Sequence, residues 1–208
     1  MKKIFILLGI LLLFLALSLV NKWHWQALQK NLPENTLSPI VSEEKTQETY
    51  KQFVSLDKDF QISYPAAWFV LDDNRILSAF NSNNWAKIYN LKTIFLTQNI
   101  LGGSFAQLMV QKGIFDIGTD KILQKMVDDS EKQGVEMEVI NSNIIENGLI
   151  FEAKYSSNSQ TLSSQEVILL KETGGGYLVS VMAAEANWPE FATSAAFIIN
   201  SAQLLTER

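Results

Sequence analysis

The chain has 208 residues, of which 47% are hydrophobic, 19% charged and 11% aromatic. These proportions are typical of an ordered globular protein and not of a disordered chain. The chain has no cysteine and a single histidine, His24, which excludes disulfides, thiol nucleophiles, iron–sulfur clusters and the usual Cys/His zinc sites.

Charge is distributed unevenly along the chain. Four of the 17 basic residues and none of the 22 acidic residues lie in the first thirty positions. Residues 31–208 therefore hold 13 basic against 22 acidic groups, a net charge of −9. A surface of this sign repels phosphate backbones and lacks a basic stripe, so we expect no nucleic-acid partner.

Residues 4–20 form an uncharged hydrophobic run. As a helix this run would rise about 25 Å, slightly less than a ~30 Å hydrocarbon core. Trp23 and Trp25 follow, where aromatic rings favour the headgroup layer. Because Lys2 and Lys3 precede the run, we expect residues 1–22 to be a single-pass signal anchor in the cytoplasmic membrane, with the N-terminus inside and the C-terminal domain outside.

A cleaved secretory signal is the alternative, with small residues around Ala16-Leu17-Ser18. In that case the protein would be secreted. A lipoprotein anchor is excluded because the chain has no cysteine.

Residues 23–52 are predicted to be a polar linker because turn formers and charges dominate them. A short helix over residues 43–53 is conceivable, although only Tyr50 and Phe53 would give it an apolar side. The folded domain is expected to cover residues 53–208.

Strands are predicted from Asp59 onward. Residues 60–64 alternate apolar with polar side chains, and Pro65 should end that strand. The apolar runs 68–71 and 76–80 predict two further strands. Residues 92–100 and 104–111 should then pair antiparallel through a turn at Gly102-Gly103.

Over residues 119–133 the spacing of apolar residues changes from alternating to helical. This pattern predicts a helix with one apolar face, ended by Gly134. Residues 135–139 and 149–155 alternate around Asn147-Gly148, which favours a type I′ hairpin.

The runs 165–171 and 177–183 are more uniformly apolar and turn at residues 174–176, which predicts strands in the middle of the sheet. A last helix should start at an Asn187 cap, with Pro189 and Glu190 in its first turn. Its apolar stripe must cover the sheet. We therefore predict an α+β domain, an antiparallel sheet flanked by helices on both faces.

One segment carries a resemblance to a known family. Residues 60–68, Phe-Gln-Ile-Ser-Tyr-Pro-Ala-Ala-Trp, resemble the opening motif F-x-I-x-Y-P-x-x-W of the PsbP-like family, named for an extrinsic protein of photosystem II. The order of the predicted elements over residues 54–205 is also similar. Ala202 departs from the pattern, because the family often has Phe after the serine that corresponds to Ser201.

The resemblance implies an αβα sandwich, extracytoplasmic placement and a role in binding or assembly instead of catalysis. Many bacterial relatives are exported proteins of unknown function, so the family indicates no particular partner, and no functional residue is carried over. Phe60, Tyr64, Pro65 and Trp68 are interpreted as structural, because aromatic side chains mostly serve core burial.

The remaining candidates for chemistry each have a structural interpretation that we favour. Gly174-Gly175-Gly176 precedes a predicted strand and not a helix, which indicates a hairpin turn instead of a phosphate loop. Asp72-Asp73 and Asp128-Asp129 match no EF-hand pattern and are interpreted as solvated charge. His24 lies beside the hydrophobic run, outside the domain, and cannot complete a triad there.

We accordingly predict no catalytic, cofactor-binding or metal-binding residue and no enzyme activity. The expected function is that of a membrane-anchored extracytoplasmic domain that binds or assembles an envelope component, with an envelope protein as partner. A small-ligand or metal-binding exported carrier is the alternative, and an uncharacterised hydrolase ranks third.

Overall fold

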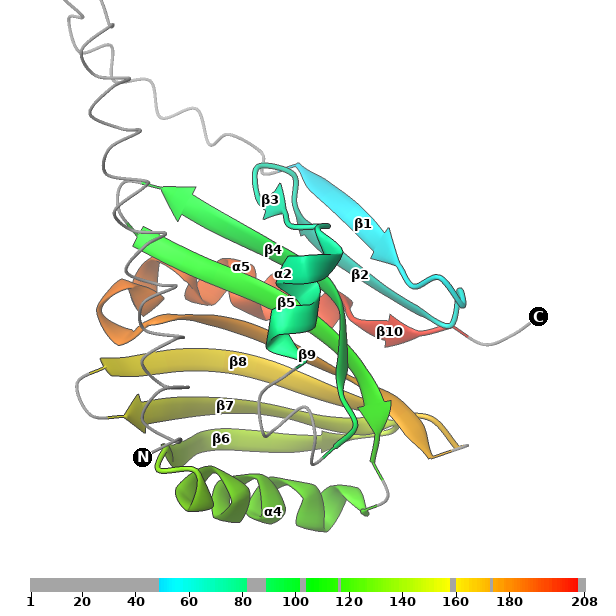
Figure 1. Ribbon diagram of the computed structural model, residues 1–208, viewed down its shortest axis with the longest axis vertical. Coiled ribbons are helices and arrows are strands. Elements are labelled where there is room, and N and C mark those ends of the chain that lie inside the picture. The colour runs from blue at the N-terminus through cyan, green and yellow to red at the C-terminus, as the bar shows by residue number, and fades with distance from the viewer. Residues whose placement is uncertain are drawn as a thin grey trace, which may run out of the picture. The chain divides into compact units, whose positions relative to one another are not determined.

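The computed structural model describes residues 49–81, 89–101, 104–115, 117–157, 160–172 and 174–205 (Figure 1). The expected anchor at residues 1–22 and nearly all of the expected linker lie outside them, as does the Gly102-Gly103 turn. Among the described residues, no helix is both long enough and apolar enough to cross a bilayer.

The main sheet has seven strands, all antiparallel to their neighbours, in the order β3-β4-β5-β9-β8-β7-β6. The predicted hairpins β4–β5, β6–β7 and β8–β9 are confirmed, and β8 and β9 lie in the interior of the sheet as expected. The strands are β3 (Phe69–Val70), β4 (Lys92–Leu101), β5 (Ser104–Ile114), β6 (Glu136–Ile145), β7 (Gly148–Ser157), β8 (Gln160–Leu170) and β9 (Gly175–Ala184).

A second sheet of three strands, which we did not predict, lies at the start and end of the domain. Strand β2 (Phe60–Pro65) is its middle strand and matches the alternating run in the sequence. It pairs antiparallel with β1 (Tyr50–Val54) on one side and β10 (Gln203–Leu204) on the other. The possible helix over residues 43–53 is therefore wrong for its described part, because Phe53 pairs with Ile62 in a strand.

The helix α2 (Asn74–Phe80) occupies the run in which we expected a strand. The prediction fails because Asp73 caps a helix there: its carboxylate accepts a hydrogen bond from the backbone N–H of Arg75 at 2.8 Å. The run is also short, and short apolar runs do not distinguish strand from helix by periodicity.

The two longer helices are confirmed. Helix α4 (Thr119–Lys132) is followed by Gly134 with φ of 76°, the left-handed conformation in which glycine commonly ends helices. Helix α5 (Trp188–Ser201) follows a 3₁₀ turn, η1 (Glu185–Asn187). Asn187 occupies the predicted N-cap position, but its side chain makes no capping hydrogen bond.

The β6–β7 hairpin turns at a different position from the one we expected. Ile145 pairs with Gly148, so the central residues of the turn are Glu146 and Asn147, and neither has the positive φ that type I′ requires. Gly148 serves packing instead: an added Cβ would lie 1.8 Å from the backbone oxygen of Ile168. The backbone of β8 therefore approaches β7 at a position where no side chain fits.

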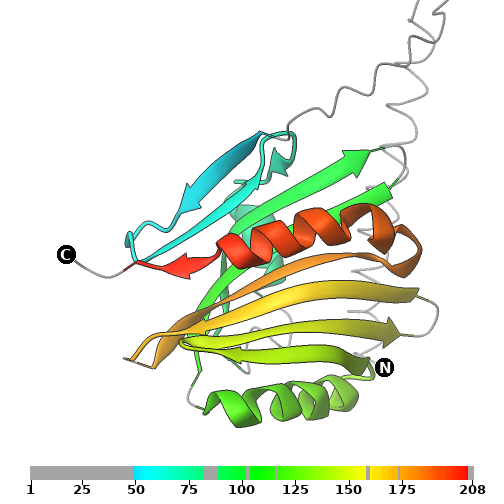
Figure 2. The same ribbon diagram turned by 180° about the vertical axis from the view of Figure 1, so that it is seen from behind.

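Two hydrophobic cores lie on opposite faces of the main sheet. Consecutive residues of β8 show this, because Val167 belongs to one core and Ile168 to the other, and successive side chains on a strand point to opposite faces. Helix α5 covers the first core together with β2, and α4 contributes Ile122 and Met126 to the second. Figure 1 shows the sheet with α2 in front, and Figure 2, from behind, shows α5 in front.

Strand β6 is one edge of the main sheet, and α4 packs against it. A bulge at Ile140 interrupts its pairing with β7, and Ile144 is 61% exposed. Covering helices and bulges both hinder pairing of an edge strand with another chain.

Candidate functional site

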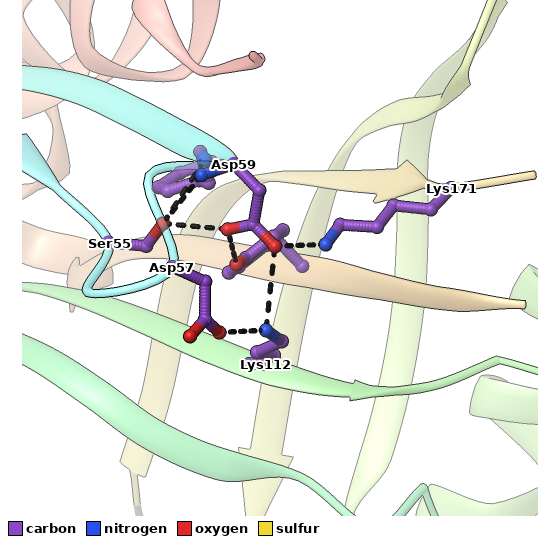
Figure 3. Close-up of polar contacts among 7 residues, drawn as sticks. Ser55, Asp57, Asp59, Lys112 and Lys171 are labelled. Carbon is purple, nitrogen blue, oxygen red and sulfur yellow. Dashed lines mark hydrogen bonds and ion pairs between the residues drawn. The ribbon is translucent and has the colours of Figure 1, made fainter. Parts of the chain in front are cut away.

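The densest polar network of the described residues surrounds Asp59, where the turn before β2 meets the ends of β5, β8 and β9 (Figure 3). We call it the Asp59 cluster. Its polar side chains come from Ser55, Asp57, Asp59, Lys112, Lys171 and Tyr177.

The Asp59 carboxylate is at the centre of the cluster, and the Asp59 side chain is 10% exposed. Its Oδ1 accepts hydrogen bonds from the Ser55 hydroxyl at 2.7 Å and from the Tyr177 hydroxyl at 2.5 Å. Its Oδ2 accepts from the Lys171 ammonium and, at 3.5 Å, from the Lys112 ammonium. Four donors from three separate parts of the chain thus converge on one carboxylate.

The turn between β1 and β2 positions Asp59. The Ser55 hydroxyl oxygen accepts from the backbone N–H groups of Asp59 and Phe60, each at 3.2 Å. The backbone of Asp59 also joins the end of the domain, because its oxygen accepts from the N–H of Leu205 at 2.9 Å. These contacts hold the carboxylate against the sheet.

The two lysines are themselves neutralised within the cluster. Lys112 binds Asp57 at 2.5 Å, and both ammonium groups lie over the ring of Tyr177, at 5.7 Å for Lys112 and 5.5 Å for Lys171. Two carboxylates therefore face two ammonium groups, and the cluster has no net charge.

The environment moves the pKa values of Asp59, Lys112 and Tyr177 away from neutrality. Burial would raise the pKa of Asp59, but the hydrogen bonds from Lys171, Tyr177 and Ser55 hold it well below its usual range. The hydrogen bond with Asp57 raises the pKa of Lys112. Burial and the bond to Asp59 raise the pKa of Tyr177. None of these three groups is thus poised to exchange a proton near pH 7, as general acid–base catalysis requires.

A second buried network surrounds Glu166 on β8. One carboxylate oxygen accepts from the hydroxyls of Tyr155 at 2.7 Å and Ser164 at 2.8 Å, and the other from Ser180 at 2.7 Å. Burial raises the pKa of Glu166, while the three hydroxyl bonds oppose that shift. Three neutral donors thus satisfy the carboxylate between adjacent strands.

A third network lies on α4. The Asp129 carboxylate binds Lys125 at 2.6 Å and Lys132 at 3.0 Å, and it accepts from the Tyr89 hydroxyl at 3.2 Å. The hydrogen bond with Lys125 is the main cause that lowers the pKa of Asp129. The hydrogen bond from Tyr89 holds the segment before β4 against α4.

The structural interpretations of the sequence candidates can now be compared with the fold. Gly174–Gly176 belongs to the β8–β9 hairpin, as predicted. Phe60 and Trp68 are buried, and Trp68 meets the Phe191 ring of α5 edge to face. Asp73 caps α2, and Asp129 is buried instead of solvated, which corrects our interpretation of that residue.

His24 lies outside the described residues. Within the described part of the chain, no group of three or more His, Cys, Asp or Glu side chains is arranged to hold a metal ion.

The sequence analysis missed the Asp59 cluster. Lys112, Lys171 and Tyr177 are 53, 112 and 118 positions from Asp59, and no local motif links them. The one signal in the sequence was that Asp59 directly precedes the alternating strand.

Comparison with known proteins rests on structure alone, since the sequence matches no family model and no curated protein. The fold is similar to the solution structure of cyanobacterial PsbP from Synechocystis sp. PCC 6803, with a TM-score of 0.51 and 12% identity, covering 84% of this chain and all of that one. The described domain has a PsbP-like fold.

Another similar structure is the Ran-binding protein Mog1p of Saccharomyces cerevisiae, with a TM-score of 0.50 and 7% identity over 76% of this chain and 96% of that one. LpqN of Mycobacterium tuberculosis, whose structure is described as involved in cell envelope biogenesis, has a TM-score of 0.46 and 11% identity, covering 77% of this chain and 92% of that one.

Proposed function

We propose that this chain is a membrane-anchored, extracytoplasmic PsbP-like domain with a non-catalytic binding or assembly role in the cell envelope. The hydrophobic run at residues 4–20 supports the anchor, and the two lysines before it favour a cytoplasmic N-terminus. The acidic balance of residues 31–208 supports a partner other than nucleic acid. We propose an envelope protein as that partner.

One observation carries the non-catalytic part of the proposal: the charged groups of the Asp59 cluster bind one another. The Asp59 carboxylate forms ion pairs with Lys112 and Lys171, and Lys112 also pairs with Asp57, so the cluster stabilises the fold through its own ion pairs. A reactive centre would instead keep a nucleophile or a base available to substrate.

The yeast structure with this fold supports the binding role. It is that of a Ran-binding protein, Mog1p, whose fold is similar to the described domain. We infer that the domain of this chain also acts through its surface.

Membrane fractionation with an alkaline wash tests the anchor, together with N-terminal analysis of the mature chain. Retention in the washed membrane with Met1 or Lys2 at the N-terminus is the expected result. Release, with a new N-terminus near Leu19, would instead show a secreted protein and overturn the anchor. Recovery in the cytosol would overturn the extracytoplasmic placement.

Cross-linking and affinity capture from solubilised membranes test the binding role. The matched control carries residues 1–48 fused to an unrelated globular domain, so that both proteins share the same tether. Partners recovered with the full chain and not with the control are the expected result. Reproducible recovery of the full chain alone would count against an assembly role.

Two further measurements separate the alternative functions. A rise in melting temperature with one member of a panel of metabolites and divalent cations would favour a carrier. Turnover of generic esters, peptides or glycosides, lost when carboxylates of the domain are substituted, would favour a hydrolase.

A further inference from the structure

Three exposed aromatic side chains distinguish one end of the domain. Tyr50 is 37% exposed, Phe69 66% and Phe197 43%, and they are the exposed aromatic residues of the described chain. The exposed large hydrophobic residues elsewhere in the described segments are all aliphatic. These are Val54, Leu56, Val70, Ile76, Ile114, Ile140 and Ile144.

The three aromatic residues gather where the chain enters the domain. The rings of Tyr50 and Phe197 are 3.9 Å apart, which joins the start of β1 to α5. Tyr50 pairs with Pro65 at the end of β2, and a short turn leads from Pro65 to Phe69. Figure 1 shows β3 beside the start of β1. We call Tyr50, Phe69 and Phe197 the aromatic patch.

Backbone contacts hold the patch in place while its side chains face outward. Phe69 and Val70 pair with Gln98 and Thr97 of β4. The Thr97 hydroxyl also donates to the backbone oxygen of Phe69 at 2.8 Å. Phe69 is thus presented from a fixed edge strand, next to Trp68, which is buried. Because its backbone is already fixed, Phe69 would lose little conformational entropy on binding.

The point at which the chain enters the domain limits what the patch can reach. Residues 21–48 separate the hydrophobic run from Thr49, the first described residue. As a flexible coil this segment would have a root-mean-square length of about 30 Å. The end of the domain that bears the patch is attached to this segment, so the patch can reach the bilayer once residues 4–20 are inserted.

We propose that the aromatic patch contacts the headgroup region of the bilayer that holds the anchor. This inference rests on the proposed function, because it requires the anchor. Tyrosine is among the side chains enriched at membrane interfaces, and phenylalanine is common on the apolar faces of interfacial segments. Tethering keeps the effective concentration of lipid high, so a few side chains suffice. The contact orients the domain with the opposite edge strand, β6, away from the lipid.

The acidic character of the domain points to zwitterionic lipid. Residues 31–208 carry a net charge of −9, and such a domain is repelled by anionic headgroups. The contact is therefore apolar, and vesicles of phosphatidylcholine are the appropriate probe.

Spin labelling of the full chain in phosphatidylcholine vesicles tests the inference. The chain has no cysteine, so Phe69→Cys and Phe197→Cys each create a unique attachment site in the patch. Ile144→Cys is the matched control, because Ile144 is 61% exposed on β6, at the other edge of the main sheet. Relaxation by oxygen reports lipid contact, and relaxation by a water-soluble nickel chelate reports exposure to water.

We expect labels at residues 69 and 197 to be several-fold more accessible to oxygen than to nickel, relative to residue 144. Equal melting temperatures of the three labelled chains show that each is folded. If all labels are exposed to water while the chain stays with the vesicles after an alkaline wash, the patch inference is overturned and the anchor is supported. If the wash removes the chain, the proposed function and this inference both fail.

Labelling in native membranes separates lipid from protein. If residue 69 is aqueous in pure vesicles but protected from maleimide in native membranes, the patch binds a protein, and the lipid assignment is overturned.

Discussion

The substitution Asp59→Asn tests the energetic role of the Asp59 cluster. Asparagine has nearly the same shape and can still accept from Ser55 and Tyr177, but it removes the charge that Lys171 and Lys112 face. Breaking a buried ion pair costs about 3–5 kcal/mol. Because the Lys171 and Lys112 side chains are 25% and 36% exposed and can reach water, we expect about 2–3 kcal/mol in the free energy of unfolding at pH 7.

Chemical denaturation at pH 7 measures this loss, and thermal unfolding should show a decrease of about 5–10 °C for a domain of this size. Asp73→Asn is the matched control. Asp73 forms an ion pair with Arg75 in which the side chains are 39% and 91% exposed. Asparagine also caps helices well, so we expect almost no change in stability there.

The pH dependence gives a second, independent measurement. The folded pKa of Asp59 is depressed, so its contribution is fully present above the pKa of the unfolded chain, near 4, and is lost as the pH falls below that value. The difference between the native chain and Asp59→Asn should therefore shrink by about 1 kcal/mol between pH 7 and pH 3. A difference that stays constant over this range, or no loss at pH 7, would refute the reasoning.

Three further substitutions test other parts of the fold, each by denaturation at equilibrium. Burial raises the folded pKa of Glu166, so Glu166→Gln should gain stability relative to the native chain as the pH rises from 4 to 7, and a trend of the opposite sign would contradict the raised pKa. Gly148→Ala should cost clearly more than Gly134→Ala, because only the first places a Cβ against the backbone of Ile168; equal costs would show that the approach is not tight. Tyr177→Phe should cost about 1–2 kcal/mol by removing the hydroxyl that Asp59 accepts from, and this cost should vanish in an Asp59→Ala background.

Most strands of the main sheet were predictable because local signals agreed. In β8 and β9 largely apolar runs flank a glycine turn, and both strands contribute buried residues to both cores. The helix α4 was predicted from the helical spacing of its apolar residues and from Gly134 at its end. The hydrophobic pattern alone determined these elements, since each buries a stripe of its own residues.

The errors occurred where a few polar contacts decide the structure. Residues 76–80 form a helix because Asp73 caps it, and the apolar run by itself does not reveal that. Strand β1 exists because its partner β2 is close in sequence, although Phe53 is its single partly buried residue. The Asp59 cluster depends on Lys112 and Lys171, which nothing in the sequence separates from the other lysines; only the completed sheet brings them to Asp59.

The three-stranded sheet has a mechanical consequence for a tethered domain. Strand β1 enters at the Pro65 end of β2, whereas β10 leaves at the Phe60 end. Tension applied between Thr49 and Leu205 would therefore pull the outer strands in opposite directions along β2. Such a load acts on the backbone hydrogen bonds of the sheet simultaneously, in shear, instead of breaking them one at a time. The three-stranded sheet therefore resists tension between Thr49 and Leu205.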